Sequence, residues 1–240
     1  MSNVIVSGRD GDVATITIDR PQEGNLLTVD MVRALAAAVR AAGASDAKVI
    51  VLSGKGEDFC LGRDPKGAAP SPTAMAMRAN VCEPILDAYA AMDGVRQPIV
   101  AVVQGRAHGF GCAIAHASDI AIAAEDARFK LPEMEYDLPP TLAITALMPR
   151  AARKALTWMV YSVAEIDAAA AQRVGIVSQV VARREIDGAL KSLIAAMTAR
   201  SPEALYAVKD FFRVATHMEP RGQADYAANL LANVLSSRAK

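Results

Sequence analysis

The chain has 240 residues, of which 52% are hydrophobic and 22% charged, and its 26 basic and 26 acidic side chains give a formal net charge of zero. A neutral chain without a block of like charge argues against nucleic-acid binding. The lack of a run of about 18 apolar residues argues against a membrane span. Cys60, Cys82 and Cys112 are widely spaced, which predicts reduced thiols in a cytoplasmic protein and neither a disulfide framework nor a metal site.

The first half of the chain alternates strand-like and helix-like patterns. Strands are predicted at 13–19, 48–53, 99–104 and 120–123. After a break at 20–25, Thr28 can cap a helix that ends at Gly43. Strands that alternate with helices over this length predict βαβ units with mostly parallel strands.

The chain is predicted to become mainly helical after about residue 149. A proline- and glycine-rich loop at 65–72 precedes a helix at 73–93, which Pro84 should kink or interrupt. After about residue 149 one short strand is expected, at 176–181. A late helix should begin with Ser201 as N-cap and Pro202 in its first turn. Its apolar positions, which include Leu205, Val208, Phe211 and Phe212, could pack on a partner subunit.

Two glycine-punctuated turns, Phe59–Asp64 and Gly105–Cys112, carry the strongest functional signal, because each follows an apolar strand. If these turns converge, two backbone N–H groups can face one anionic oxygen. The alternative is that the glycines only allow tight packing of strand on helix. The glycine spacing does not match G-x-G-x-x-G, so a dinucleotide site is not expected. Asp64 is interpreted as structural, whereas the Arg63 side chain could face a phosphate or solvent.

An acidic segment at 129–140 contains Glu133, Glu135 and Asp137. A carboxyl group in an apolar pocket has a raised pKa, which suits proton transfer near neutrality. The alternative is that all three are solvated loop charges. The three histidines do not form a zinc pattern, and no G-x-S-x-G indicates a serine nucleophile.

Together these segments resemble the crotonase superfamily, also called the enoyl-CoA hydratase/isomerase family, over about residues 10–215. The resemblance rests on Arg20-Pro21 with Asn25, Phe59–Asp64, Gln104–Cys112, Ser118–Ala123, Ala127–Phe129 with Pro132-Glu133, and Gly175–Val177 with Val180-Val181. It implies an α/β fold, a crotonase-like spiral of ββα units over residues 1–195. A helical trimerisation section would follow over 196–240, giving a homotrimer or homohexamer.

The resemblance also implies binding of acyl-CoA thioesters whose carbonyl oxygen lies between two backbone N–H groups. In this chain the donors would be Arg63 and Phe110, although the family commonly has glycine at the second position. Neighbouring substrate-binding positions would be Leu61, Gly62, Gly109 and Gly111. No metal or redox cofactor is expected, since coenzyme A is part of the substrate.

Hydratases of the family typically use two glutamates. Glu133 matches the second, but Ala113 stands where the first is expected. Asp137 or His108 could be auxiliary groups, and the family's glycine-rich stretch after Glu133 is altered at 138–142. We therefore expect an enoyl-CoA hydratase/isomerase-like enzyme with one glutamate acid/base. The alternatives are another CoA-dependent activity, either thioester hydrolysis or C–C cleavage, and an inactive CoA-binding homologue.

Overall fold

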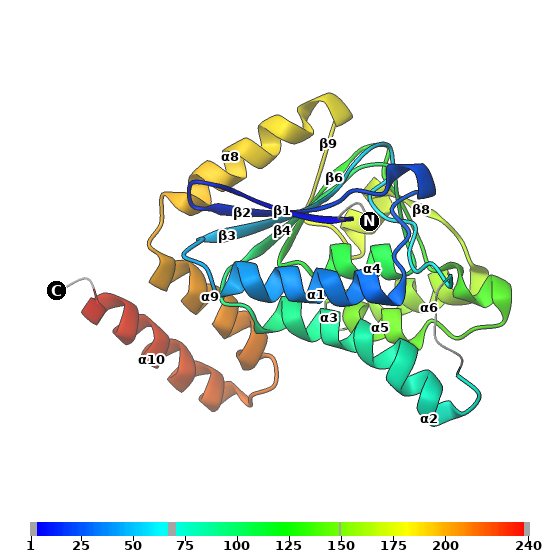
Figure 1. Ribbon diagram of the computed structural model, residues 1–240. Helices are drawn as coiled ribbons and strands as arrows, with labels where there is room; N and C mark the ends of the chain where they lie inside the picture. Colours follow the sequence, from blue (N-terminus) through cyan, green and yellow to red (C-terminus); the bar gives the residue numbers. More distant parts are fainter. Residues whose placement is uncertain (1–3, 67–70, 149, 238–240) are drawn as a thin grey trace.

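A computed structural model describes residues 4–66, 71–148 and 150–237 of the chain (Figure 1). The strands are β1 (Ile5–Asp10), β2 (Val13–Ile18), β3 (Val49–Gly54), β4 (Ile99–Val103), β5 (Arg106–His108), β6 (Ile120–Ala124), β7 (Arg128–Lys130), β8 (Ile166–Asp167) and β9 (Gln179–Val181). The main sheet has the order β1-β2-β3-β4-β6-β9, and a smaller sheet has the order β5-β7-β8. Pairing is parallel except between β1 and β2 and between β7 and β8. The expectation of mostly parallel strands is therefore confirmed.

The helices follow the strands as the pattern of βαβ units requires. They are α1 (Val29–Gly43), α2 (Ala74–Met77), α3 (Glu83–Gly94), α4 (Phe110–Ala117), α5 (Thr141–Leu147), α6 (Arg153–Ser162), α7 (Ala168–Arg173), α8 (Ile186–Thr198), α9 (Pro202–Ala215) and α10 (Pro220–Ser237). Thr28 caps α1 by accepting a hydrogen bond from the Met31 amide, and Ser201 caps α9 by accepting from the Ala204 amide. Both predicted N-caps are confirmed.

The main sheet is covered on both faces. Ile50 and Leu52 of β3 pack with α1 and α3 on one face, whereas Val49 packs toward Met197 of α8 on the other. Figure 1 shows α8 on one side of the strands and α1 with α3 on the opposite side. Burial on both faces explains why β3 and β4 are continuous apolar runs.

Two predicted elements differ in detail from the structure. The helix expected at 73–93 is split, because a π-helical segment, Arg78–Cys82, separates α2 from α3 just before Pro84. The strand expected at 176–181 is shorter, since the Ile176 and Val177 amides donate to the Ala171 carbonyl at the end of α7 and do not join the ladder. Part of the loop expected at 65–72 lies outside the described residues.

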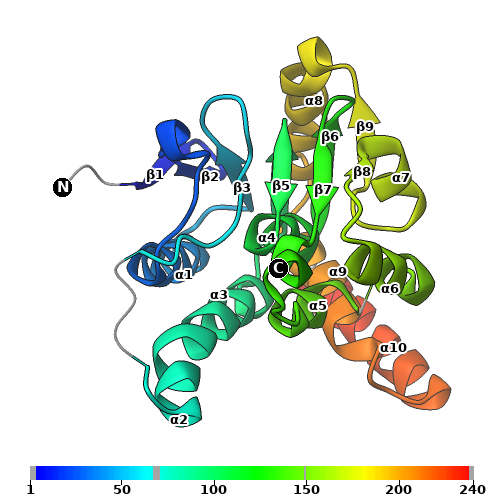
Figure 2. The ribbon, with the colours of Figure 1, turned by 90° about the vertical axis from the view of Figure 1, so that its right-hand side faces the viewer.

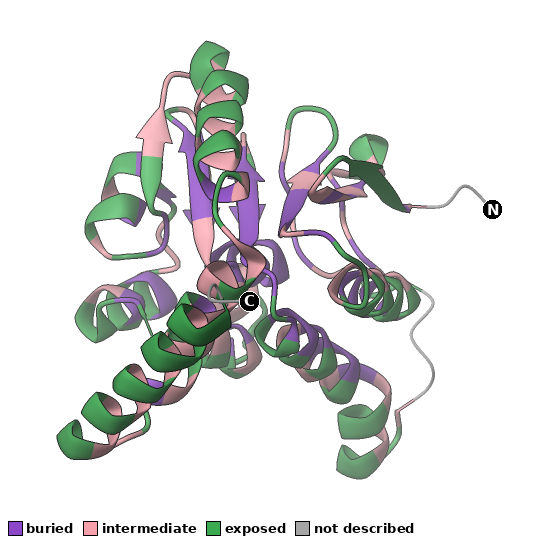
Figure 3. Ribbon diagram, turned by 90° about the vertical axis from the view of Figure 1, so that its left-hand side faces the viewer, coloured by how far each residue is buried: buried purple, intermediate pink, exposed green. Residues whose placement is uncertain are grey.

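The C-terminal helices stand apart from the sheets. In Figures 1 and 2, α10 (red) projects away from the strands and lies along α9. Figure 3 shows that α10 consists of exposed and intermediate residues, and none of its residues is buried. The expected boundary between residues 195 and 196 falls inside α8, which packs on the main sheet.

Candidate active site

The two glycine turns meet. The Cys60 amide donates to the Arg106 carbonyl at 3.1 Å, and the His108 amide donates to the Cys60 carbonyl at 3.0 Å. A Cβ at Gly111 would lie 2.0 Å from the Cys60 carbonyl oxygen. This close approach needs glycine at position 111, so the helix that follows the second turn begins directly against the first turn.

The Arg63 amide lies next to this meeting place. The Gly62 carbonyl accepts from the Leu27 amide at 3.0 Å, and the Asp64 amide donates to the Leu27 carbonyl at 2.8 Å. Since C=O and N–H of a trans peptide point in opposite directions, the Arg63 N–H faces away from Leu27. A Cβ at Gly62, whose φ is +108°, would lie 3.6 Å from the Phe110 nitrogen. The start of α4 therefore lies next to the first turn.

The Phe110 amide is a second backbone N–H group next to the first turn. Phe110 is the first residue of α4, so its N–H has no acceptor within the helix. Across the described part of the chain, neither the Arg63 amide nor the Phe110 amide donates a hydrogen bond. Two free donors beside a helix N-terminus form a place where negative charge on an oxygen is stabilised.

Glu133 supplies a carboxyl group at the same place. It lies in a 3₁₀ helix, Pro132–Tyr136, and a Cβ at Gly109 would lie 3.0 Å from its Oε1 atom. Its Oε2 atom is buried and has no hydrogen-bond partner among the described residues. Burial raises the pKa of Glu133, opposed by a hydrogen bond from its own backbone amide. The carboxyl group is thus suited to accept and return a proton.

Comparison with known proteins places the chain in a family. A model described as enoyl-CoA hydratase/isomerase matches residues 8–239. The chain belongs to this family. It is 33% identical over 216 residues to a 2,3-dehydroadipyl-CoA hydratase of Escherichia coli K12, covering 89% of this chain and 82% of that protein.

Other members of the enoyl-CoA hydratase/isomerase family match less of the chain or are more distant in sequence. "Probable enoyl-CoA hydratase echA6" of Mycobacterium bovis is 35% identical over 126 residues, 52% of this chain; the match spans about half of that relative, 49%. An enoyl-CoA hydratase structure from Mycobacterium smegmatis has a TM-score of 0.92 at 26% identity and covers 97% of this chain and 91% of that chain. A structure from Thermobifida fusca YX, in complex with CoA, has a TM-score of 0.89 at 25% identity, covering 99% and 95%. The expected crotonase-like fold is confirmed.

Glu133 differs in exposure from the other two acidic residues of its segment. Glu135 is exposed and forms an ion pair with Lys130 at 2.6 Å. Asp137 is exposed and ends the 3₁₀ helix in a left-handed conformation with φ of 54°. The sequence left open whether all three were solvated, and the structure separates half-buried Glu133, which has a buried carboxylate oxygen, from two exposed residues.

The remaining residues expected at the site have varied surroundings. His108 Nε2 lies 2.9 Å from Glu165 Oε2; burial lowers the pKa of His108, whereas Glu165 opposes this change. Leu61 packs against the Gly24 turn, and its amide donates to the Gly24 carbonyl at 2.9 Å. Ala113 is fully buried, and its amide donates to Gly109. Position 113 therefore supplies no polar side chain to the site.

The structural interpretation of Asp64 is confirmed. Asp64 is 3% exposed and forms an ion pair with Arg20 at 2.8 Å. Burial alone would raise the pKa of Asp64, but the Lys66 amide and Arg20 outweigh it and lower the pKa. The neighbouring Arg63 Nη1 atom is buried without a hydrogen-bond partner among the described residues. The pair with Arg20 ties the first turn to the segment before α1.

The sequence patterns did not predict Tyr89 as a residue near the site. This residue of α3 stacks its ring on Phe110, with centroids 5.7 Å apart and an interplanar angle of 26°. Burial raises the pKa of Tyr89, and the Glu133 charge adds to the effect. Burial and Glu133 likewise raise the pKa of Cys112 to about 12. The charge of Glu133 therefore affects both Tyr89 and Cys112.

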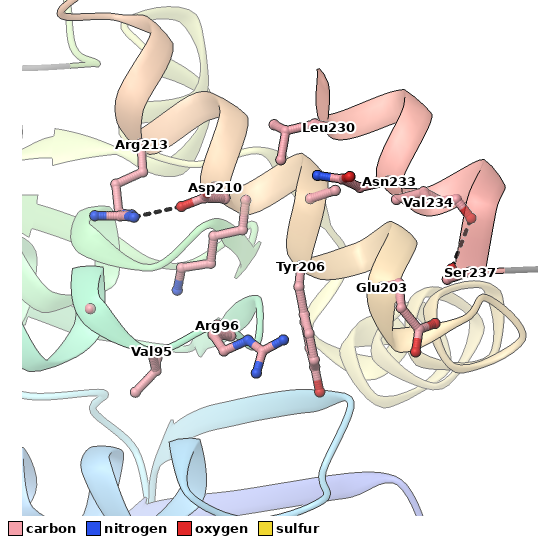
Figure 4. Close-up of a pocket in the computed structure, with 13 residues that line it drawn as sticks. Val95, Arg96, Glu203, Tyr206, Asp210, Arg213, Leu230, Asn233, Val234 and Ser237 are labelled. Carbon is pink, nitrogen blue, oxygen red and sulfur yellow. Dashed lines mark hydrogen bonds and ion pairs between the residues drawn. The ribbon is translucent and has the colours of Figure 1, made fainter. Parts of the chain in front are cut away.

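A separate pocket of about 350 Å³ lies between the end of α3 and helices α9 and α10 (Figure 4). It contains Arg213 paired with Asp210 at 2.5 Å, and Arg96 over the Tyr206 ring at 5.0 Å. None of its lining residues belongs to the site beside Glu133.

Among the described residues, no group of three or more His, Cys, Asp or Glu side chains could hold a metal ion. No described helix is long and apolar enough to cross a membrane.

Proposed function

We propose that this chain is an acyl-CoA enzyme of the hydratase/isomerase type. It would stabilise a thioester enolate between the Arg63 and Phe110 amides and move protons with Glu133. The observation that carries the proposal is the convergence of two free backbone donors and one buried carboxyl group at the meeting of two glycine turns. A family member named 2,3-dehydroadipyl-CoA hydratase and a relative in complex with CoA support this substrate class.

The two amides act on the carbonyl oxygen of the thioester. As a proton leaves the α-carbon, or as a nucleophile adds at the β-carbon, negative charge moves onto this oxygen. Donors fixed before the reaction stabilise that charge, and in other enzymes one such donor is worth about 3 kcal/mol. The N-terminus of α4 adds the favourable end of a helix dipole. These interactions strengthen as the enolate forms.

Glu133 supplies the proton transfers. In a double-bond shift, its carboxylate takes a proton from one acyl carbon and returns it to another, so no atom is gained or lost. In hydration, it takes a proton from water as the oxygen bonds to the β-carbon, and returns that proton to the α-carbon. In both reactions, the raised pKa of Glu133 favours the intermediate in which its carboxyl group is protonated. These steps require no metal or redox cofactor.

Ala113 favours one alternative, a protein that binds acyl-CoA without turnover. The test compares Glu133→Gln with Glu135→Gln, which changes an exposed carboxyl two residues away. Turnover is measured on a panel of enoyl-CoA thioesters, and binding by calorimetry with a saturated acyl-CoA. Glu133→Gln should lower kcat by about 10³-fold with affinity nearly intact, whereas Glu135→Gln should behave as wild type.

The alternative predicts a different result. A wild-type protein that binds acyl-CoA but neither adds water, nor shifts a double bond, nor exchanges the α-proton in deuterated water would be a binding protein. Unchanged turnover in Glu133→Gln would refute the assigned role of the carboxyl group.

Assembly and location complete the proposal. We infer a homotrimer or homohexamer, because Val208 and Phe212 of α9 and Leu231 and Leu235 of α10 are large exposed apolar side chains. Light scattering would measure the mass, and a monomer at micromolar concentration would contradict this inference. The free cysteines are compatible with the reducing conditions of the cytoplasm.

A further inference from the structure

The active site has one buried carboxyl group, although hydration benefits from two polar groups that hold the reacting water. Position 113 carries a methyl group and offers no hydrogen bond. From another element, Tyr89 of α3 stacks its ring on Phe110, which follows Gly109, the residue against which the Glu133 carboxyl lies. Its hydroxyl group has no role in the fold, since it forms no hydrogen bond within the described residues.

We propose that Tyr89 is a positioning residue whose hydroxyl group, together with the Glu133 carboxyl, holds the water that adds to the acyl chain. This inference rests on the proposed function and assigns the site to hydration. Tyr89 would supply the second polar group that position 113 lacks.

The geometry places both groups around the same two residues. The Tyr89 ring stacks on Phe110, and the Glu133 carboxylate lies against Gly109. The amide of Phe110 is the proposed donor to the thioester oxygen. The Tyr89 ring and the Glu133 carboxyl group therefore both lie next to the pair of residues that carries this donor. The Tyr89 ring stacks on the Phe110 side chain, at a position where the family commonly has glycine.

Both polar groups have unused hydrogen-bonding capacity. Tyr89 is half-buried and its hydroxyl group forms no hydrogen bond within the described residues, and a buried carboxylate oxygen without a partner is costly by about 1–3 kcal/mol. Glu133 Oε2 is such an atom within the described structure. One water that donates an O–H to each group would satisfy both, and would leave its lone pair directed at the β-carbon.

The chemical step then balances. The water oxygen bonds to the β-carbon, the electron pair of the double bond moves through the α-carbon onto the thioester oxygen, and Glu133 takes the proton. Glu133 next returns that proton to the α-carbon as the carbonyl re-forms. Tyr89 keeps its own proton throughout. Because its surroundings disfavour the phenolate, the hydroxyl adds no second negative charge beside Glu133.

The test is Tyr89→Phe, which keeps the ring stacked on Phe110 and deletes the hydroxyl oxygen. Tyr161→Phe is the matched control, because Tyr161 of α6 is 77% exposed. Two readouts are compared: water addition to an enoyl-CoA, and exchange of the α-protons of a saturated acyl-CoA in deuterated water. Exchange needs the amides and Glu133 but no bound nucleophile.

Tyr89→Phe should lower kcat for hydration by about 10- to 100-fold, with KM and the exchange rate within about threefold of wild type. A purely structural role would lower both rates together. Equal hydration by Tyr89→Phe and wild type, parallel loss of both rates, or a wild type that exchanges without hydrating would each overturn this inference alone. A wild type with neither activity would overturn the proposed function itself.

Discussion

Gly111→Ala tests whether the contact between the two turns sets the active geometry. The added Cβ would lie 2.0 Å from the Cys60 carbonyl oxygen, and contacts below about 3.0 Å essentially do not occur. The turns must therefore separate by about 1 Å. Position 111 lies within α4, so backbone strain does not complicate the result. A displacement of this size between positioned groups can cost about 100-fold in rate.

The assay is kcat/KM for an enoyl-CoA, with thermal unfolding measured on the same sample. Crowding the core should cost about 1–3 kcal/mol, which lowers Tm by about 5 °C for a chain of this size and leaves the protein folded. Gly188→Ala on α8 is the control, since nothing lies within 4 Å of its Cβ. That variant should keep wild-type activity. A folded Gly111→Ala variant with wild-type kcat/KM would refute the reasoning.

Three further predictions concern charge. Because burial raises the pKa of Glu133, the acid limb of the kcat/KM profile should bend above pH 4.5. The folded state also binds this proton more tightly than the unfolded chain, so Glu133→Gln should become more stable relative to wild type as pH rises past that value. A difference in urea midpoint between variant and wild type that is the same at pH 4 and pH 8 would contradict this prediction. Asp64→Ala should lower the free energy of unfolding by about 2 kcal/mol, since Arg20 is only 16% exposed and loses its closer carboxylate, keeping Glu23 at 3.5 Å; an unchanged urea midpoint would count against this ion pair.

The sequence predicted those features that depend on local chemistry. The Thr28 and Ser201 caps, the continuous strands β3 and β4, and the two glycine turns follow from residue types at fixed spacings. The family resemblance rests on the same segments, and the family match confirms it. Glu133 was selected from three carboxyl groups by resemblance, because nothing in the residues alone distinguishes it from Glu135.

Features that depend on contacts between distant segments could not be predicted in the same way. The convergence of the turns is set by hydrogen bonds between Cys60 and the segment Arg106–His108. Tyr89 lies on a helix whose face toward the site is defined only after α3 packs near α4. The short β9 reflects competition between a strand ladder and the end of α7 for the Ile176 and Val177 amides. Each outcome depends on tertiary partners that a local pattern does not contain.

The parallel bridge between Cys60 and Ala107 has a consequence for how the chain gains activity during folding. Helices such as α1 can form from nearby residues, whereas this bridge joins segments separated by β4 and the whole of α2 and α3. Contacts of such large sequence separation carry a high entropic cost and form late. A collapsed intermediate can therefore contain most of its helices and still be unable to hold a thioester. On the proposed function, turnover would report completion of the tertiary fold.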